Sequence, residues 1–307
     1  MYMLRLHTLP ALLICLCALS PVMAKDGYNI WKGTSCHADV RLIPYPAKGN
    51  CSNTACIVCP GGSYFWLART TEGEGVARWL QANGISAYVL EYRVGGVPAF
   101  LTRYRLLARG HRYPDMLQDV QRSIQLLREE VMPRETTGLC RLGVMGFSAG
   151  GHLAVMAGEF FDTDVLSSLG ISTSVSLRPD FIVPVYPVVT LSASVAHKRS
   201  RRGILGEGRA MTQVMKDSLS LERHVRPDMP PTFLVNCVDD PIVDYRNSEL
   251  LDSAMTAMGI PHTYIQYRTG GHGFGANPGK TTREAIQWKE AFLKWLGTLE
   301  WQDATGD

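Results

Sequence analysis

The sequence lacks the features that mark several classes of protein. After residue 24, no continuous apolar run reaches about 18 residues, the length at which a segment is read as membrane-spanning. The formal charge of +3 over 307 residues gives no indication of nucleic-acid binding. Histidines and cysteines do not occur at zinc-binding spacing, and internal repeats, heptad arrays and low-complexity linkers are absent. These absences leave one compact domain, residues 25–307, as the expected organisation.

The first 24 residues have the pattern of a cleavable export signal. Arg5 and His7 precede the apolar run 9–19, and Val22-Met23-Ala24 fits a small-residue cleavage site. The apolar run is too short to span a bilayer comfortably. We therefore expect cleavage after Ala24 and a mature protein that is periplasmic or secreted, with no membrane attachment.

The most informative motif is Gly146-Phe147-Ser148-Ala149-Gly150. A strand-like run at 140–147 precedes the serine, and a helix-like segment rich in small residues follows it at 149–158. Glycines two positions either side of a serine permit the sharp turn that exposes its hydroxyl. This order of strand, turn and helix predicts that Ser148 is a nucleophile, with an ordinary glycine-rich turn as the alternative.

A serine hydroxyl becomes reactive only beside a base, and an acid must orient that base. The candidate base is His272 in the segment TGGHGFG, residues 269–275. This glycine-rich loop follows a strand-like run at 262–268 and leaves the imidazole ring free to reach across a site. The chain order of serine, acid and histidine then requires the acid between these two residues.

The candidate acids follow a strand-like run at 232–237, in the segment VDDPIVD at 238–244. Asp240 lies at the first turn past the strand, directly before a proline, and is the predicted acid. Asp239 is the alternative, since its position is more typical of a carboxylate that caps a turn. Asp244 is a second rival that is better placed to cap the next helix.

Acyl transfer also needs N–H donors for the oxyanion that develops on the substrate. The apolar run 55–59 opens into Pro60-Gly61-Gly62-Ser63-Tyr64, a counterpart of an HGGG-type loop. We assign the oxyanion hole to the backbone amides of Ala149 and of Gly62 or Ser63. A plain Gly-Gly turn is the alternative.

Aromatic residues are expected around the substrate. Tyr64 and Trp66 follow the oxyanion loop and are candidate substrate-binding residues, because an aromatic ring can lie against the C–H face of a sugar. The stretches 95–113 and 191–225 interrupt the alternation of strands and helices and should rim the active-site face. The basic run 197–202 is interpreted as a solvated loop, with contact to an acidic glycan or a membrane surface as the alternative.

The remaining pattern predicts an α/β fold with a doubly wound, mainly parallel sheet. Residues 28–32 and 40–45 can pair as an N-terminal hairpin. Apolar residues from 117 to 131 recur at helical spacing and mark a helix packed on the sheet. The predicted strands are 54–59, 85–91, 141–147, 181–186, 232–238 and 262–267, and a final helix is expected at 281–299.

Taken together, the motifs resemble the α/β-hydrolase superfamily and, within it, bacterial carbohydrate esterases of the acetylxylan and feruloyl esterase type. The resemblance covers residues 53–298 and implies the triad Ser148, Asp240 and His272. This sequence departs from the family pattern at Ser63, where a third glycine is common, and at Asp244, where an apolar residue or proline is common. The matching segments are CPGGSY at 59–64, EGEGVARWL at 72–80, GISAYVLEYRV at 84–94, RLGVMGFSAGGHLA at 141–154, PPTFLVNCVDDPIV at 230–243 and GGHGFG at 270–275.

This resemblance implies a serine esterase that removes acyl groups from plant cell-wall polysaccharide such as xylan. The expected partner is an acylated polysaccharide or oligosaccharide, and the mechanism calls for no metal or organic cofactor. Acetyl is the first expectation for the acyl group. Feruloyl esterase activity, or general carboxylesterase or formamidase activity on the same fold, are the alternatives. The sequence leaves the oligomeric state and the disulfide pattern open.

Overall fold

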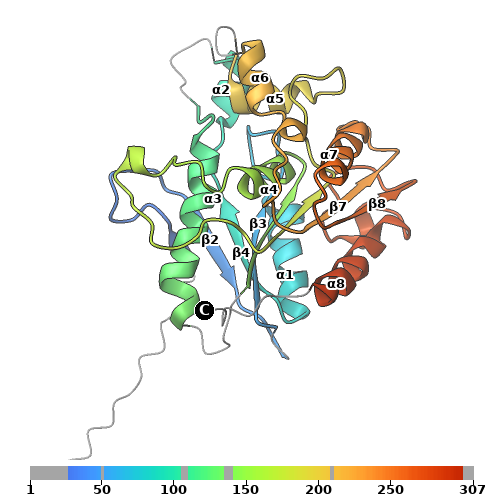
Figure 1. Ribbon diagram of the computed structural model, residues 1–307, viewed down its shortest axis with the longest axis horizontal. Coiled ribbons are helices and arrows are strands. Elements are labelled where there is room, and N and C mark those ends of the chain that lie inside the picture. Colours follow the sequence, from blue (N-terminus) through green and yellow to red (C-terminus); the bar gives the residue numbers. More distant parts are fainter. Residues whose placement is uncertain (1–26, 50–51, 105–109, 135–140, 208–210, 300–307) are drawn as a thin grey trace, which may run out of the picture.

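One eight-stranded sheet organises the computed structural model, which describes residues 27–49, 52–104, 110–134, 141–207 and 211–299. The strand order is β1-β2-β4-β3-β5-β6-β7-β8 (Figure 1). β2 runs antiparallel to β1 and β4, and the other neighbouring pairs are parallel. The strands are β1 (Tyr28–Asn29), β2 (Arg41–Tyr45), β3 (Thr54–Cys59), β4 (Ser86–Glu91), β5 (Arg141–Phe147), β6 (Phe181–Val185), β7 (Thr232–Cys237) and β8 (His262–Tyr267).

Helices cover both faces of this sheet, which confirms the predicted doubly wound α/β architecture. The α-helices are α1 (Gly75–Ala82), α2 (Gly96–Thr102), α3 (Asp115–Leu126), α4 (Ala149–Glu159), α5 (Lys198–Leu205), α6 (Gln213–Ser218), α7 (Arg246–Ala257) and α8 (Trp288–Thr298). Short helical segments lie at Arg69–Glu74, Leu127–Val131, Met132–Arg134, Ser167–Leu169, Leu221–Arg223, Pro278–Lys280 and Ala285–Gln287.

The central strands are apolar because both of their faces are buried. Every residue of β3, β6 and β7 is buried, as expected for strands of a parallel sheet covered on two sides. On one face α3, α4 and α7 pack into a shared core, and on the other α1 and α8 form a second core around Leu80 and Trp288. The apolar positions predicted along α3 and its extension are all buried: Leu117, Val120, Ile124, Leu127 and Val131.

The N-terminal hairpin forms as predicted, but its first strand contains only two residues. The chain turns directly after β1, where the Thr34 N–H donates to the Trp31 carbonyl at 3.1 Å. The indole N–H of Trp31 donates to the buried carboxylate of Asp119 at 2.8 Å. The same carboxylate accepts a hydrogen bond from the Arg93 N–H at 2.7 Å, so the hairpin is anchored to both α3 and the end of β4.

The final helix begins later than the sequence predicts. Residues 281–284 are not part of α8, because their side chains bind the loop before His272 instead. Thr281 donates to the Gly270 carbonyl at 2.9 Å, and Thr282 donates to the Thr269 carbonyl at 2.8 Å. These contacts brace one end of the histidine loop against the body of the protein.

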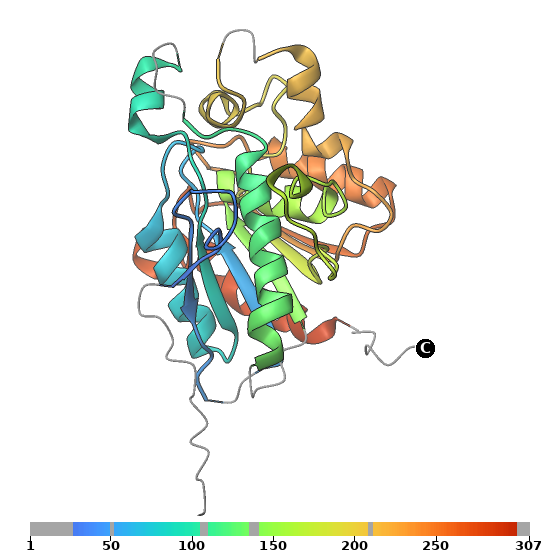
Figure 2. The same ribbon diagram turned by 90° about the vertical axis from the view of Figure 1, so that its left-hand side faces the viewer.

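The two stretches that interrupt the alternation form a rim beyond the carboxyl ends of the parallel strands. Figures 1 and 2 show α2, α5 and α6 gathered at that end of the molecule. The insertions are also bonded to each other, since the Tyr104 hydroxyl donates to the Gly203 carbonyl at 2.9 Å and the Tyr113 N–H to the Ile204 carbonyl at 2.9 Å. Within the described ranges, no helix is both long and apolar enough to cross a membrane.

Candidate active site

Ser148 lies at a sharp turn between β5 and α4. Its backbone angles, φ 55° and ψ −116°, are strained for a residue other than glycine, and such strain is typical of functional turns. The flanking glycines are required by space, because a Cβ at Gly146 would lie 1.9 Å from the Gly150 carbonyl oxygen. A Cβ at Gly150 would lie 2.0 Å from the Cys59 carbonyl oxygen. Both glycines are therefore required for the turn that places Ser148 directly after β5.

Ser148, His272 and Asp240 form one hydrogen-bonded chain. The Ser148 Oγ lies 2.9 Å from His272 Nε2, and His272 Nδ1 lies 2.6 Å from Asp240 Oδ2. The Asp240 side chain is 1% exposed, and its other oxygen accepts the N–H groups of Ile242 and Val243 at 2.8 and 3.0 Å. This geometry can pass a proton from the serine hydroxyl to the imidazole while the carboxylate fixes the ring.

The two rival carboxylates have other partners. Asp239 Oδ1 accepts the backbone N–H groups of residues 270–271 at 2.9 and 2.8 Å, so this side chain binds the loop that carries His272. Asp244 accepts the N–H of Arg246 at the start of α7 and forms an ion pair with its guanidinium. Of the three candidates, Asp240 is the one bonded to the His272 ring.

The oxyanion loop presents free N–H groups beside the serine. Gly62 and Ser63 both have positive φ angles, 136° and 56°, which turn their amides away from the regular strand direction. Among the described residues, no hydrogen bond uses either N–H. Ala149 is the first residue of α4, where an N–H has no carbonyl partner within its own helix. A Cβ at Gly61 would lie 2.9 Å from the Ser148 Cβ, so the loop packs directly against the nucleophile.

A buried carboxylate that the sequence analysis missed connects the loops of the site. Glu72 Oε2 accepts the Gly61 N–H at 2.8 Å, and its Oε1 accepts the Tyr186 hydroxyl at 2.9 Å. The Tyr186 oxygen in turn accepts the Gly275 N–H at 2.9 Å, and the tyrosine and His272 ring centroids are 4.6 Å apart. Burial raises the pKa of Glu72, whereas its hydrogen bonds and the nearby His272 lower it. In the sequence, Glu72 is the first residue of EGEGVARWL at 72–80, one of the segments that carry the family resemblance.

The prediction that Tyr64 binds substrate is wrong. Its side chain is fully buried, and its hydroxyl lies 2.9 Å from His152 Nδ1. His152 Nε2 donates to the Leu219 carbonyl at 2.9 Å, and burial lowers the pKa of this histidine to about 4. The neutral ring must therefore accept a hydrogen bond from the Tyr64 hydroxyl at Nδ1. Tyr64 is oriented inward because its backbone continues the left-handed turn of the oxyanion loop, with φ 63°.

Trp66 stays at the surface, where its residue is 38% exposed. It lies edge-on to Phe100 of α2, with ring centroids 5.4 Å apart. The Arg199 guanidinium lies 5.9 Å from the centre of its ring. Arg199 belongs to α5, so the basic run predicted to be a solvated loop is in fact a helix on the rim.

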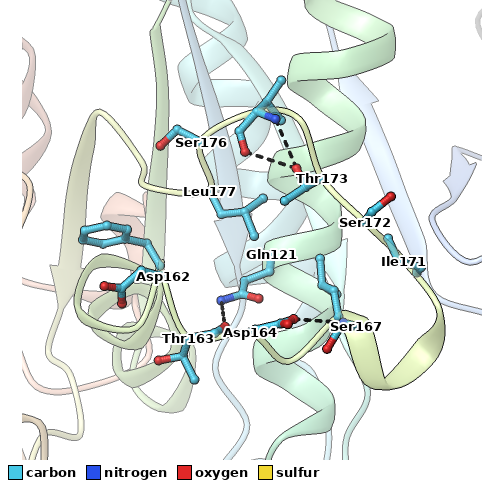
Figure 3. Close-up of a pocket in the computed structure, with 13 residues that line it drawn as sticks. Gln121, Asp162, Thr163, Asp164, Ser167, Ile171, Ser172, Thr173, Ser176 and Leu177 are labelled. Atoms are coloured by element: carbon cyan, nitrogen blue, oxygen red, sulfur yellow. Dashed lines mark hydrogen bonds between the residues drawn. The ribbon is translucent and has the colours of Figure 1, made fainter.

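A separate cavity of about 540 Å³ lies beside α3, between that helix and the segment 161–177 (Figure 3). Its polar groups serve local structure. The Gln121 amide donates to the Thr163 carbonyl at 3.1 Å, and Asp164 accepts the Ser167 N–H at 2.9 Å. None of the three triad residues lines this cavity. In the part of the chain that the structure describes, acidic residues, histidines and cysteines form no group of three or more that could hold a metal ion.

Comparison with known proteins places this site in a family context. The family model BD-FAE matches residues 52–255. The chain is 29% identical over 233 residues to an acetylxylan esterase of Xylanibacter ruminicola, covering 74% of this chain and 42% of that protein. It is 28% identical over 260 residues to endo-1,4-beta-xylanase B of Butyrivibrio fibrisolvens, covering 83% of this chain and 38% of that protein. The chain thus spans about two-fifths of the length of these relatives.

Solved structures show the same fold. The acetyl ester-xyloside bifunctional hydrolase of Caldicellulosiruptor lactoaceticus superposes with a TM-score of 0.76 at 32% identity, covering 91% of this chain and 98% of that chain. A thermophilic esterase of Thermogutta terrifontis superposes with a TM-score of 0.68 at 20% identity, covering 94% and 97%. The second match supports the α/β-hydrolase fold alone.

Proposed function

The chain belongs to the BD-FAE family, and from that membership we propose that it is a serine esterase that removes acetyl groups from a xylan-type polysaccharide. The observation that carries the proposal is the continuous hydrogen-bonded chain from Ser148 through His272 to Asp240 at the carboxyl ends of the parallel strands. The similarity to an acetylxylan esterase and to an acetyl ester-xyloside hydrolase supports the choice of substrate.

In the proposed reaction, His272 Nε2 takes the Ser148 proton as the serine oxygen attacks the ester carbonyl. The Asp240 carboxylate stabilises the imidazolium that forms. The N–H groups of Ala149 and of Gly62 or Ser63 bind the oxyanion of the tetrahedral intermediate. The imidazolium then protonates the departing sugar oxygen, and a water molecule activated by the same histidine hydrolyses the acyl-serine.

The test is acid release from native acetylated and feruloylated xylan, with products separated by chromatography. We expect acetate from the unmodified protein and a loss of about 10⁶-fold in kcat with Ser148→Ala. Ser253→Ala, an exposed serine on α7, is the matched control and should retain full activity. Ferulate alone would keep the mechanism and change the acyl group, whereas hydrolysis of simple aryl esters or formamides without either acid would contradict the proposed substrate.

We also propose that residues 1–24, which lie outside the described residues, direct export to the periplasm or the medium. An enzyme that acts on extracellular polysaccharide must reach it, which supports this location. N-terminal sequencing of the protein recovered from outside the cytoplasm should begin at Lys25. A protein retained in the cytoplasm with its first residues intact would contradict export.

A further inference from the structure

Positive charge is concentrated in the two rim insertions. In the sequence, residues 95–113 and 191–225 together hold 11 of the 31 Lys and Arg residues and three of the 28 Asp and Glu residues. These segments therefore carry a formal charge of +8, whereas the whole chain carries +3. A field of this kind attracts anions to the end of the molecule that holds the active site.

Within this rim, α5 lies between the oxyanion loop at 60–64 and the segment 238–244 that carries Asp240. The helix packs tightly on the oxyanion loop, because a Cβ at Gly203 would lie 2.2 Å from the Ser63 carbonyl oxygen. On its other side, the first residues of α5 line a pocket of about 410 Å³ together with Ile242 and Asp244, which belong to the segment 238–244 that carries the acid Asp240. Arg199 lines this pocket, and its guanidinium also lies over the Trp66 ring, so Arg199 lies between Trp66 and the segment 238–244.

The cations of α5 have no acidic partner within the described residues. Among the described residues, no carboxylate forms an ion pair with Lys198 or Arg199, and both residues are exposed. Two acidic side chains at this end of the molecule have other cationic neighbours, since Asp244 pairs with Arg246 and Glu207 lies 3.8 Å from the Arg103 guanidinium. The guanidinium on Trp66 is thus positioned by an aromatic ring and retains its donors for an external anion.

We propose that Lys198 and Arg199 form a subsite for the carboxylate of a uronic acid unit, so that the substrate is an acylated acidic polysaccharide. This inference rests on the proposed esterase function. A planar guanidinium can bind a carboxylate with two parallel hydrogen bonds, which a neutral sugar hydroxyl does not offer. The subsite gives Trp66 a different role from the predicted sugar platform, because its ring orients Arg199.

The test compares two substrates that differ only in charge: an acetylated xylan with glucuronic acid side groups, and the same xylan after its carboxyl groups are reduced to alcohols. The unmodified enzyme should show a higher kcat/KM for acetate release from the charged substrate, and salt should diminish that preference. R199Q should lower kcat/KM on the charged xylan about 5-fold more than on the reduced xylan. K294Q, an exposed cation on α8, is the matched control and should keep the preference.

An equal loss on both substrates would assign Arg199 to the geometry of the rim and overturn the subsite. An unchanged preference in K198Q/R199Q would overturn it as well. Calorimetry with the S148A protein separates the subsite from the esterase proposal, because binding does not require turnover. The subsite is supported if the S148A protein binds a xylo-oligosaccharide that bears a uronic acid more tightly than a neutral one, and if adding R199Q removes this preference. If that result is obtained but no protein releases acetate, only the esterase proposal is overturned.

Discussion

Glu72 and Tyr186 lie 114 positions apart in the sequence, yet the tyrosine hydroxyl donates to the glutamate carboxylate at 2.9 Å. The carboxylate also holds Gly61 of the oxyanion loop, and the hydroxyl also holds Gly275 of the histidine loop. One buried contact therefore fixes the oxyanion donors relative to the base. Positions of this kind set catalytic geometry without touching the substrate.

Replacing Glu72 should slow turnover without abolishing it. Glu72→Gln keeps the volume but turns one acceptor into a donor, which cannot satisfy both the Gly61 N–H and the Tyr186 hydroxyl as they stand. We expect kcat to fall about 10-fold, less than the roughly 10² to 10³ lost with an oxyanion donor, while KM changes little. Steady-state kinetics on an aryl acetate measure this split. A rise in KM at constant kcat would instead indicate a binding role.

The two neighbouring aspartates should differ sharply in their effects. Asp240→Asn should reduce kcat by about 10⁴, because the amide no longer fixes the imidazole tautomer. Asp239→Asn keeps an oxygen that can accept the N–H groups of residues 270–271, so kcat of this variant should fall by no more than about 10-fold. Parallel kinetics of the two variants decide the assignment. Comparable losses in both would show that the two carboxylates share the orienting role.

Tyr64→Phe should affect stability rather than specificity. The variant leaves His152 Nδ1 without its hydrogen-bond donor in a fully buried position. We expect a loss of about 1 to 3 kcal/mol in the free energy of unfolding, measured by urea denaturation. The ratio of activities on polysaccharide and on small esters should not change. A selective loss on polysaccharide at unchanged stability would restore Tyr64 as a substrate contact.

Glu159 should make stability depend on pH. Its carboxyl group is buried in α4, and neither of its oxygens has a hydrogen-bond partner among the described residues. Burial, and then the nearby charge of Glu222, raise the pKa of Glu159 well above its usual value. The folded state therefore binds this proton more tightly than the unfolded state does. The contribution of Glu159 to the free energy of unfolding is complete at a pH below the pKa of the unfolded state, and it is lost as pH rises through the raised pKa of the folded state.

Glu159→Gln removes this proton requirement. We expect the midpoint of thermal unfolding of the variant, relative to the unmodified protein, to be similar near pH 4 and to become increasingly higher up to pH 8. Circular dichroism at several pH values measures the difference. Glu130→Gln, an exposed residue, is the control that should show no such trend. A constant offset at all pH values would show that Glu159 does not titrate differently on folding.

Several elements of this protein can be read from sequence because their causes are local. Strands β3, β5 and β8 match the predicted 54–59, 141–147 and 262–267, since apolar residues dominate the first two and β-branched and aromatic residues the third. The sharp turn at Ser148 depends on glycines at 146 and 150, where a Cβ would collide with backbone. Family membership was likewise visible in the motifs and is confirmed by the match to residues 52–255.

From local patterns, the sequence predicted the strands along the chain, the elbow at Ser148 and the glycine-rich loop that carries His272, but not the rim helices α2, α5 and α6. Which side chains contact one another across the sheet depends on the folded structure. The fold bonds the imidazole to the predicted Asp240 rather than to Asp239, buries Tyr64 and brings Glu72 into contact with Tyr186. Backbone conformation follows from near neighbours in the chain, whereas these contacts link loops brought together at the carboxyl ends of different strands only when the sheet has formed.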